Sequence, residues 1–323
     1  MSAPDGTGFR PTASRAALER RAALLARVRA FFAGRGVLEV ETPILSRGAA
    51  TDPAIDSLAT RIAGQAGEWY LQTSPEFAMK RLLAAGYGDI YQVARVFRDG
   101  ECGPWHNPEF TLLEWYRLGF DDAALMDEVE ALVGELLAPE RPLPPAERLT
   151  YAAALERHTG IADAPHASLD ALRAAAASWG LASVGLERDA LLDLLMGVAV
   201  GPRLGHGRAC FVCDYPASQA ALARLKTPTV AARFELYLDG VELANGFHEL
   251  ADPREQRRRF EADRALRRAR GQREPPIDEQ LLAALEAGLP ACAGVALGFD
   301  RLVAVTLGAR ALSQVMAFPI DNA

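Results

Sequence analysis

Hydrophobic residues recur at helical spacing near the start of the chain. After Ser14, which suits a helix N-cap, apolar side chains occupy one face at Leu18, Leu24, Leu25, Val28, Phe31 and Phe32. Gly34 and Gly36 end this pattern, and a short strand is predicted over residues 37–41, stopped by Pro43. We interpret the arginines of this helix as a solvated face, with a partner surface as the alternative.

Two apolar segments joined by a polar loop predict a β-hairpin. Residues 90–97 read IYQVARVF and residues 110–116 read FTLLEWY, and glycines and a proline interrupt the stretch between them. Paired strands hold neighbouring side chains close together, so we expect Arg98 and the cluster from His106 to Glu109 to surround one ligand. This stretch is interpreted as an active-site hairpin, and the alternative is a solvated polar loop.

The middle of the chain is predicted to be helical. An amphipathic helix is expected over residues 121–137, a proline-rich linker over 139–145 and an alanine-rich helical insertion over about 146–208. The three histidines between residues 158 and 206 show no ligand-like spacing, so we interpret them as structural or exposed.

Strands return in the later part of the chain and are mainly antiparallel. Residues 209–216 read as a strand, and Asp239-Gly240 forms a strong two-residue turn between two further strands. An arginine-rich helix is predicted over residues 253–270, with solvation as the default explanation and an acidic macromolecular partner as the alternative. Residues 292–308 predict a strand that runs into a helix near Asp300.

Composition limits the class of protein. With 323 residues, 50% of them hydrophobic and 24% charged, the chain suits one large globular catalytic domain with an insertion, or two domains. It has no apolar run of about 18 residues, so no membrane span is expected. Residues 1–13 resemble a flexible arm rather than a targeting peptide, and a cytoplasmic protein is expected. The net charge of −7 argues against a surface that binds nucleic acid throughout.

Of the four cysteines, only Cys210 and Cys213 are close in sequence. Their surroundings read as a strand without further soft ligands, which disfavours a zinc or redox site but leaves it as an alternative.

Three motifs in a fixed order resemble the catalytic domain of class II aminoacyl-tRNA synthetases. They are GVLEVETP at residues 36–43, FRDGE and HNPEF within 97–110, and GVALGFDRL at 294–302. TSPE at 73–76 and ELANGFHEL at 242–250 resemble the lysyl branch. The resemblance implies an α+β fold over residues 14–323, with a mainly antiparallel sheet flanked by helices.

Lysyl-tRNA synthetases carry an additional N-terminal OB-fold domain for the anticodon, which we do not expect here. The chain resembles the free-standing ligases that attach (R)-β-lysine to a lysine of elongation factor P. PASQAALA at 216–223 fits that group, as does Ala296, which stands where lysyl-tRNA synthetases usually have glycine. The resemblance implies activation of (R)-β-lysine or lysine by ATP and Mg²⁺ as an acyl-adenylate, followed by transfer to elongation factor P. The alternatives are transfer to tRNA or another small acceptor, and a catalytically impaired nucleotide-binding regulator.

The resemblance also implies an ATP site. Arg98 would hold the α-phosphate and the substrate carboxylate, Phe110 would stack on adenine, and Arg301 would lie over adenine near the γ-phosphate, so that both arginines act in catalysis. Glu242 would bind Mg²⁺. The remaining ATP-binding residues would be Asp99, Gly100, His106, Asn107, Leu243 and Gly298.

A substrate with two ammonium groups requires several carboxylates, because a buried cation needs paired charge. The resemblance assigns this role to Glu76, Glu114 and Glu249. The other substrate-binding residues would be Ser74, Pro75, Tyr116, Asn245 and Ala296.

Two positions depart from the family pattern. Gly100 replaces a glutamate that binds ATP, and Pro104 replaces a loop arginine. We expect Glu101 or backbone groups to substitute for them. The helix and strand of the first motif form the subunit interface in class II enzymes, which implies a homodimer.

Overall fold

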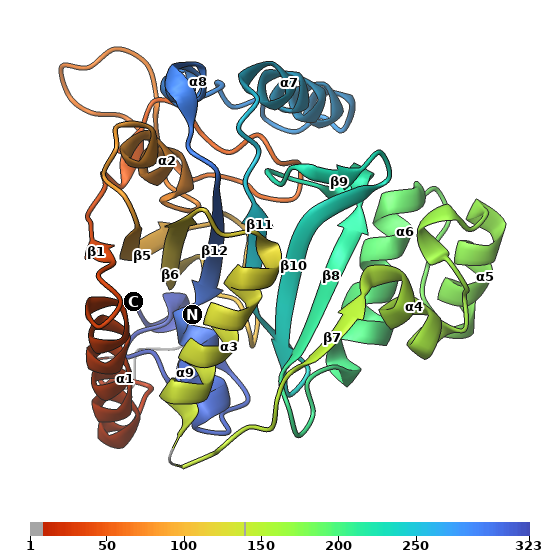
Figure 1. The fold of residues 1–323 in the computed structure, drawn as a ribbon, viewed down its shortest axis with the longest axis horizontal. Helices are drawn as coiled ribbons and strands as arrows, with labels where there is room; N and C mark the ends of the chain where they lie inside the picture. Colours follow the sequence, from red (N-terminus) through yellow and green to blue (C-terminus); the bar gives the residue numbers. More distant parts are fainter. Residues whose placement is uncertain (1–8, 139) are drawn as a thin grey trace, which may run out of the picture. The chain divides into compact units, whose positions relative to one another are not determined.

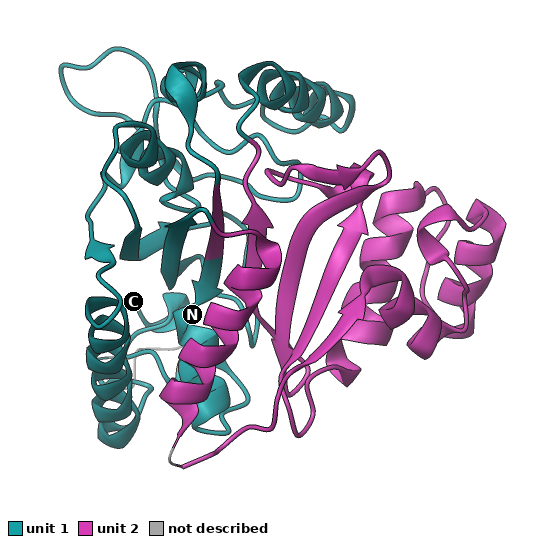
Figure 2. Ribbon diagram, in the orientation of Figure 1, with its two compact units in different colours: residues 1–119, 251–291, 296–323 teal, residues 120–250, 292–295 magenta. Residues whose placement is uncertain are grey.

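The computed structural model describes residues 9–138 and 140–323 (Figure 1). The chain divides into two units, each with its own internal contacts (Figure 2). The first comprises residues 1–119, 251–291 and 296–323, and the second comprises residues 120–250 and 292–295. Residues 1–8 of the predicted arm lie outside the described residues, whereas the Thr12 amide donates to the Ala317 carbonyl at 2.9 Å.

The first unit begins with the predicted amphipathic helix, α1 (Arg15–Ala33). The Ser14 hydroxyl caps it by accepting a hydrogen bond from the Ala17 amide at 3.2 Å. Its apolar face is buried, with Phe31 and Phe32 almost fully covered. The prediction of this helix and its cap is confirmed.

The predicted hairpin is also confirmed. Strand β5 (Ile90–Phe97) pairs antiparallel with β6 (Glu109–Leu118) along its whole length. Strand β1 (Leu38–Glu39) lies parallel to β5 and is shorter than the predicted strand over 37–41. The Val40 amide still donates to the Tyr91 carbonyl at 2.9 Å, but regular pairing stops there, three residues before Pro43.

Several elements of the first unit have no clear sequence signal. A small antiparallel sheet has the order β2 (Leu45–Ser46), β4 (Trp69–Leu71) and β3 (Ala59–Thr60). Helices α2 (Glu76–Ala84) and α8 (Glu279–Gly288) pack against each other.

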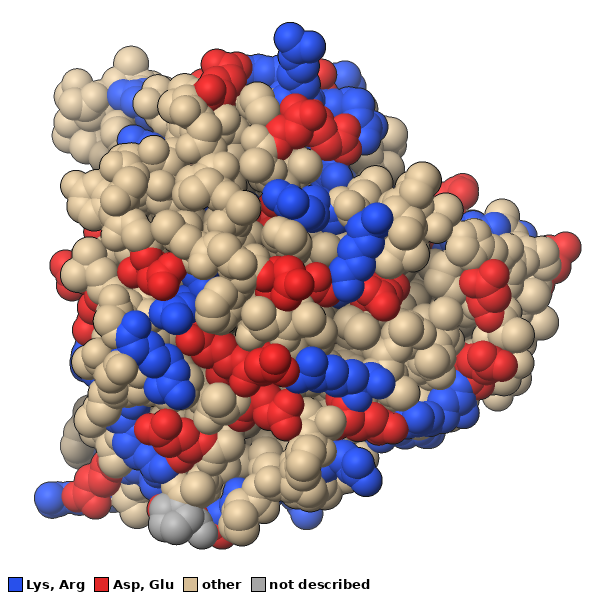
Figure 3. Space-filling view, in the orientation of Figure 1, with Lys and Arg blue, Asp and Glu red and all other residues tan. Residues whose placement is uncertain are grey.

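Two further helices of the first unit match the sequence prediction. Helix α7 (Pro253–Ala269) is arginine-rich, and α9 (Phe299–Thr306) follows β12 (Cys292–Gly298), whose first four residues belong to the second unit. The arginines of α7 form ion pairs with Glu255, Glu274 and Glu279. Basic and acidic side chains are interspersed over the face shown in Figure 3.

The second unit holds an antiparallel sheet around β10 (Val230–Leu238). Its neighbours are β11 (Val241–His248) and β8 (Cys210–Pro216), with β9 (Leu225–Thr227) also on β10 and β7 (Glu147–Thr150) parallel to β8. Asp239 and Gly240 both have positive φ, 51° and 76°, as the predicted two-residue turn requires.

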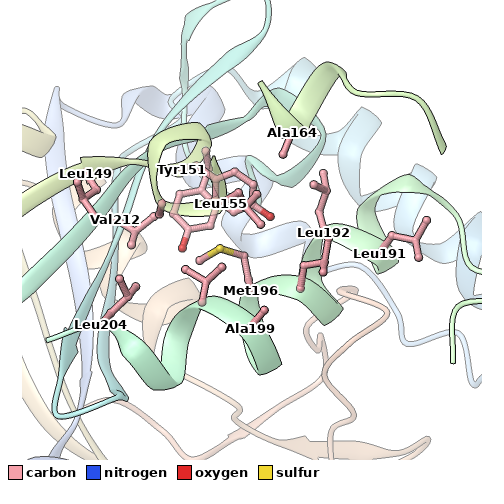
Figure 4. Packing of buried hydrophobic residues seen from close by; sticks show 14 of the residues in the cluster. Leu149, Tyr151, Leu155, Ala164, Leu191, Leu192, Met196, Ala199, Leu204 and Val212 are labelled. Carbon is pink, nitrogen blue, oxygen red and sulfur yellow. The ribbon is translucent and has the colours of Figure 1, made fainter. Parts of the chain in front are cut away.

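Helices flank this sheet. Helix α3 (Asp122–Leu137) packs on β10 and β11, while α4 (Tyr151–Thr159) packs on β7 and β8. Next come α5 (Leu169–Ser178) and α6 (Arg188–Leu195), the latter extended by a π-helical turn at Met196–Val200. Figure 4 shows their shared core, in which alanines let the helices approach closely. Short 3₁₀ turns in the chain are Ala164–His166, Gly201–Arg203, Ala217–Gln219, Leu312–Gln314 and Ile320–Asn322.

The neighbouring cysteines Cys210 and Cys213 have the character of structural residues. Burial raises the pKa of both Cys210 and Cys213 to about 11, so their thiols stay protonated at neutral pH. Among residues 9–138 and 140–323, no three His, Cys, Asp or Glu side chains form a metal-ligand cluster. No helix in those same ranges has the length and apolar character needed to cross a membrane.

Candidate active site

Arg98 stands where β5 leaves the sheet, and the chain around it fixes its position. Its amide donates to the Pro108 carbonyl at 2.8 Å, which closes the loop, and its Nε donates to the Thr73 carbonyl at 3.3 Å. The guanidinium lies 5.1 Å from the centre of the Phe110 ring and 3.5 Å from a Glu101 carboxylate oxygen. A cation beside an aromatic face can hold a phosphate and a flat base as neighbours.

Arg301 extends from α9 toward the same loop. Its Nε donates to the Trp105 carbonyl at 3.1 Å, and Nη2 lies 2.9 Å from Nε2 of His106. A guanidinium can only donate, so Nε2 of His106 accepts. Burial, followed by the Arg301 charge, lowers the pKa of His106 below its ordinary value of 6.5, so the imidazole is neutral at physiological pH. Gly298 is the N-cap of α9 and lies against the Arg301 side chain.

A buried ion pair anchors α9 to the hairpin. Asp300, which is 2% exposed, pairs with Arg21 of α1 and accepts a hydrogen bond from the Thr111 amide at 2.6 Å. Arg21 also donates to the Thr111 hydroxyl at 2.7 Å. Sequence reasoning missed this link, although Asp300 directly precedes Arg301 in the motif. The pair positions Arg301 relative to Phe110, which precedes Thr111 on β6.

A second cluster of polar residues lies at the start of α2. The Glu114 carboxylate accepts hydrogen bonds from the Ser74 hydroxyl at 2.6 Å and the Tyr116 hydroxyl at 2.7 Å. Glu76 opens α2 after Pro75 and pairs with Lys80 at 2.6 Å. Glu114 is 2% exposed, so this acidic group is held inside the protein.

The pKa of Glu114 is raised to about 7, and burial is the largest cause, followed by the negative charge of Glu76. The hydrogen bonds from Ser74 and Tyr116 and the charge of Lys80 act in the opposite direction. Desolvation therefore outweighs the local donors. A positively charged ligand would stabilise the ionised form of Glu114 and would therefore lower its pKa.

The two clusters are neighbours along one wall of the first unit. Thr73 contacts Arg98 through its carbonyl, and the next residue, Ser74, contacts Glu114. Ala296 is half-buried and packs with Phe110 on a core of Ala94, Val96 and Leu112. Thr73 and Ser74 thus join Arg98, which was assigned to phosphate binding, to Glu114, which was assigned to amine binding.

The loop residues have local partners of their own. Asn107 donates to the Glu109 carbonyl at 2.6 Å and accepts from the Ile320 amide at 2.9 Å, so its side chain ties the loop to the C-terminal segment. The Asp99 amide donates to the Asp56 carbonyl at 2.8 Å.

The two positions that depart from the family pattern have different surroundings. Gly100 has a φ of +76° and open space where a Cβ would lie, so its backbone suits glycine. The Pro104 carbonyl accepts from the Leu312 amide at 2.7 Å. Glu101, the expected substitute for the missing glutamate, is engaged with Arg98.

Four predicted site residues belong to the second unit. Glu242, Leu243 and Asn245 lie on β11, and Glu249 follows it with only 1% of its surface exposed. The Asn245 side-chain oxygen is buried and has no hydrogen-bond partner among the described residues. An orphaned acceptor of this kind suits a ligand with N–H donors. The roles of these four residues stay predictions.

A carboxylate near Glu242 was missed by the sequence analysis. Glu235 on β10 accepts hydrogen bonds from Arg233 at 2.6 Å and from Tyr237 at 2.7 Å, and it stands opposite Asn245 in the strand pairing. The alternation of polar and apolar residues along β10 is the sequence signal that could have identified Glu235. Mg²⁺ in nucleotide sites needs only one or two carboxylates besides phosphate oxygens. The half-buried Glu242 fits that requirement as a single carboxylate ligand.

Comparisons with known proteins identify the family to which the sequence belongs. The model of the family described as tRNA synthetases class II (D, K and N) matches residues 7–322. A protein of Salmonella paratyphi B (strain ATCC BAA-1250 / SPB7), named elongation factor P–(R)-beta-lysine ligase, is 49% identical over 98% of both chains. A protein of Vibrio cholerae serotype O1 with the same name is 49% identical over 97% of this chain and 98% of its own.

Proposed function

Because this chain belongs to the class II (D, K and N) tRNA synthetase family, we propose that it is an ATP-dependent ligase that activates (R)-β-lysine and transfers it to a lysine side chain of elongation factor P. Its α+β architecture, with a mainly antiparallel sheet flanked by helices, is that of the family. The named ligases that it resembles at 49% identity over nearly their whole length support the proposal.

The observation that carries the proposal is the adjacency of two opposite charge environments. Arg98 and Arg301 present guanidinium groups on the loop side, and Glu76 and Glu114 present carboxylates beside them. An amino acid with additional ammonium groups can place its carboxylate toward the arginines and its amines toward the glutamates. A neutral or acidic amino acid would leave the buried Glu114 without compensation.

The chemistry follows from this orientation. A carboxylate oxygen of the substrate attacks the α-phosphorus of ATP, the bond to pyrophosphate breaks, and an acyl-adenylate forms. The amine of the acceptor lysine then attacks the acyl carbon, loses a proton, and AMP leaves. Arg98 stabilises the charge that develops on the α-phosphate, and Arg301 fixes the nucleotide, so that alignment and electrostatics supply the rate enhancement.

The remaining groups orient the reactants. Mg²⁺, held by Glu242, would neutralise phosphate charge when bound. Tyr116 and Ser74 hold Glu114 in one position through their hydroxyls. The family resemblance assigns substrate-binding roles to Asn245, as a hydrogen-bond acceptor, and to Glu249, as a carboxylate.

Intact-mass analysis tests the proposal. Incubation of the chain with ATP, Mg²⁺, (R)-β-lysine and elongation factor P should add one β-lysyl group to the acceptor protein. Arg98→Met should abolish the addition. Arg95→Met, which removes a surface arginine three residues earlier whose side chain is 49% exposed, should leave it unchanged. An unmodified acceptor with the wild-type chain, under conditions where the Salmonella ligase modifies it, would refute the proposal.

We also propose that the chain forms a homodimer through α1 and the segment that follows it, and that it works in the cytoplasm, where ATP and elongation factor P are present. Two large apolar side chains in that segment support the dimer, because Leu38 is 50% exposed and Ile44 is 42% exposed. Within the described part of the chain, strand β1 pairs with a single strand, β5, and its other edge is open.

A further inference from the structure

A lysine is buried beside the two carboxylates of the amine cluster. Lys80 lies one helical turn after Glu76 in α2, is 1% exposed, and places Nζ 2.6 Å from Oε1 of Glu76. A fully buried lysine is uncommon unless its charge is paired. This position therefore carries a stabilised internal ammonium group.

The composition of the chain makes this lysine informative. Of its 35 basic residues, only Lys80 and Lys226 are lysines, and the others are arginines. A chain that uses arginine almost everywhere retains a lysine at its most buried cationic position. The compact ammonium group of Lys80 contacts one carboxylate oxygen of Glu76. The planar guanidinium of an arginine at this position would engage both oxygens.

We propose that Lys80 is a positioning residue of the amine pocket: its ammonium group binds Oε1 of Glu76 and leaves Oε2 for an ammonium group of the substrate. This inference rests on the proposed function for the identity of the ligand. Oε2 of Glu76 has no hydrogen-bond partner among the described residues, and 14% of this side chain is exposed, so the oxygen remains accessible.

Lys80 also sets the charge balance around Glu114. The groups that face Glu114 are Glu76 and Lys80 of α2, Ser74 before α2, and Tyr116 on β6. Glu76 raises the pKa of Glu114 and Lys80 lowers it. Without Lys80, two carboxylates would share a desolvated site with no internal cation, and one would take up a proton. A protonated carboxyl group binds an ammonium ion poorly, so the pocket would lose affinity at neutral pH.

The first test needs no substrate. Carbon-13 NMR titration of glutamate carboxyl groups should show the pKa of Glu114 rising above its wild-type value in Lys80→Met, a nearly isosteric change that removes the charge. Lys226→Met, which removes the other lysine and its ion pairs with Asp122 and Asp214 in the second unit, is the matched control and should leave this titration unchanged. An unaltered Glu114 titration in a folded Lys80→Met protein would overturn the electrostatic part of the proposal.

If Lys80→Met does not fold, the double variant Glu76→Gln/Lys80→Met provides the measurement. It removes both members of the pair together and leaves no uncompensated charge in α2. In it, the pKa of Glu114 should fall below its wild-type value, because Glu76 raises this pKa more than Lys80 lowers it. A pKa that stays at or above the wild-type value would contradict the assigned roles of Glu76 and Lys80.

The second test measures substrate activation. In ATP–pyrophosphate exchange, Lys80→Met should raise KM for (R)-β-lysine about tenfold at pH 7, and the difference should shrink toward pH 9 as the carboxylates ionise, with kcat changed much less. Lys80→Arg should keep the wild-type pH profile, because the charge remains, but should raise KM, because the guanidinium would engage both oxygens of Glu76. An equal loss of kcat at every pH would overturn the proposal in favour of a merely structural lysine. If the wild-type chain shows no lysine-dependent exchange, the proposed function fails, while the NMR titration still decides the role of Lys80.

Discussion

Arg301 and His106 are joined by a hydrogen bond of 2.9 Å in which a guanidinium donates to the lone pair of an imidazole. The contact links the motif at α9 to the loop of the β5–β6 hairpin. Together with burial, which is the larger cause, it favours the neutral form of His106, because an imidazolium could not accept this bond and would be repelled by the neighbouring charge. The neutral form keeps Arg301 oriented toward the loop.

This relationship predicts a depressed histidine titration. His106 should titrate below 6.5 in two-dimensional NMR, as should His158 and His248, but only His106 should respond to Arg301→Met, whose lost positive charge should raise its pKa. Arg310→Met, at an exposed position on the same unit, is the control and should have no effect. His106 binds a proton more readily in the unfolded protein than in the folded protein. Its contribution to the free energy of unfolding is therefore present above pH 6.5 and is lost as the pH falls from 6.5 through the lower pKa of the folded state. A His106 pKa above 6.5 in the wild type would contradict the assignment.

The buried pair between Asp300 and Arg21 predicts a large loss of stability on truncation. Asp300→Ala removes the partner of a guanidinium that is 16% exposed and of the Thr111 amide, and should lower the free energy of unfolding by about 3–5 kcal/mol. Urea denaturation measures this. Asp321→Ala, at an exposed position of the same unit, should change the free energy by less than about 0.5 kcal/mol. Equal effects of the two changes would show that the pair does not stabilise the fold.

Glu114 predicts a pH dependence of opposite sign from that of an ordinary carboxylate. Its pKa of about 7 in the folded protein exceeds the ordinary glutamate value of 4.5, so between these two values the folded state holds a proton that the unfolded state has released. Glu114 should therefore reduce the stability of the ligand-free protein progressively from about pH 4.5 to pH 7.

The measurement is a comparison of urea unfolding at pH 5 and pH 8. Glu114→Gln should gain about 1–3 kcal/mol relative to the wild type on going from pH 5 to pH 8, because the amide cannot ionise. Glu109→Gln, whose side chain is 50% exposed on the same strand, should show no such gain. If the difference in the free energy of unfolding between Glu114→Gln and the wild type were the same at pH 5 and pH 8, the raised pKa would be contradicted.

The sequence predicted the elements whose signal is local. Helix α1 was recognised from its apolar spacing and the Ser14 cap, and the β10–β11 turn from Asp239-Gly240, because these features depend on neighbouring residues alone. The sheet of β2, β3 and β4 was not predicted, since strands of two or three residues are too short to show any periodicity.

In the candidate site, too, some residues could be predicted from the sequence and others could not. The motif residues Arg98, Glu114 and Arg301 could be named from the sequence because the family pattern contains them. Their supporting contacts could not, because Asp300 with Arg21 and Asn107 with Ile320 join segments more than 200 residues apart. Lys80 went unassigned for another reason: a lysine four residues after a glutamate usually indicates an exposed helix pair, and only burial shows otherwise.

The proposed dimer predicts that an exposed apolar residue becomes essential for assembly. Light scattering at micromolar concentration should give twice the chain mass of 34.8 kDa for the wild type, whereas Leu38→Asp should shift it toward the monomer, because a charge would be buried at the interface. Val184→Asp, at a position in the second unit that is 98% exposed, is the control. A monomeric wild type would refute the dimer.

Two glycines of the second unit predict opposite effects of the same substitution. Gly246 lies between Asn245 and Phe247 on β11, and a Cβ there would come within 2.7 Å of Cε1 of the fully buried Phe234 ring. Gly246→Ala should therefore lower the free energy of unfolding by about 1–3 kcal/mol and displace Asn245. Gly134 lies within α3 with nothing within 4 Å of its Cβ position, so Gly134→Ala should raise the free energy of unfolding by about 0.5–1 kcal/mol through the lower backbone entropy of the unfolded chain. Denaturant titration of both variants decides the matter, and a stabilising Gly246→Ala would mean that β10 and β11 do not pack as closely as the structure shows.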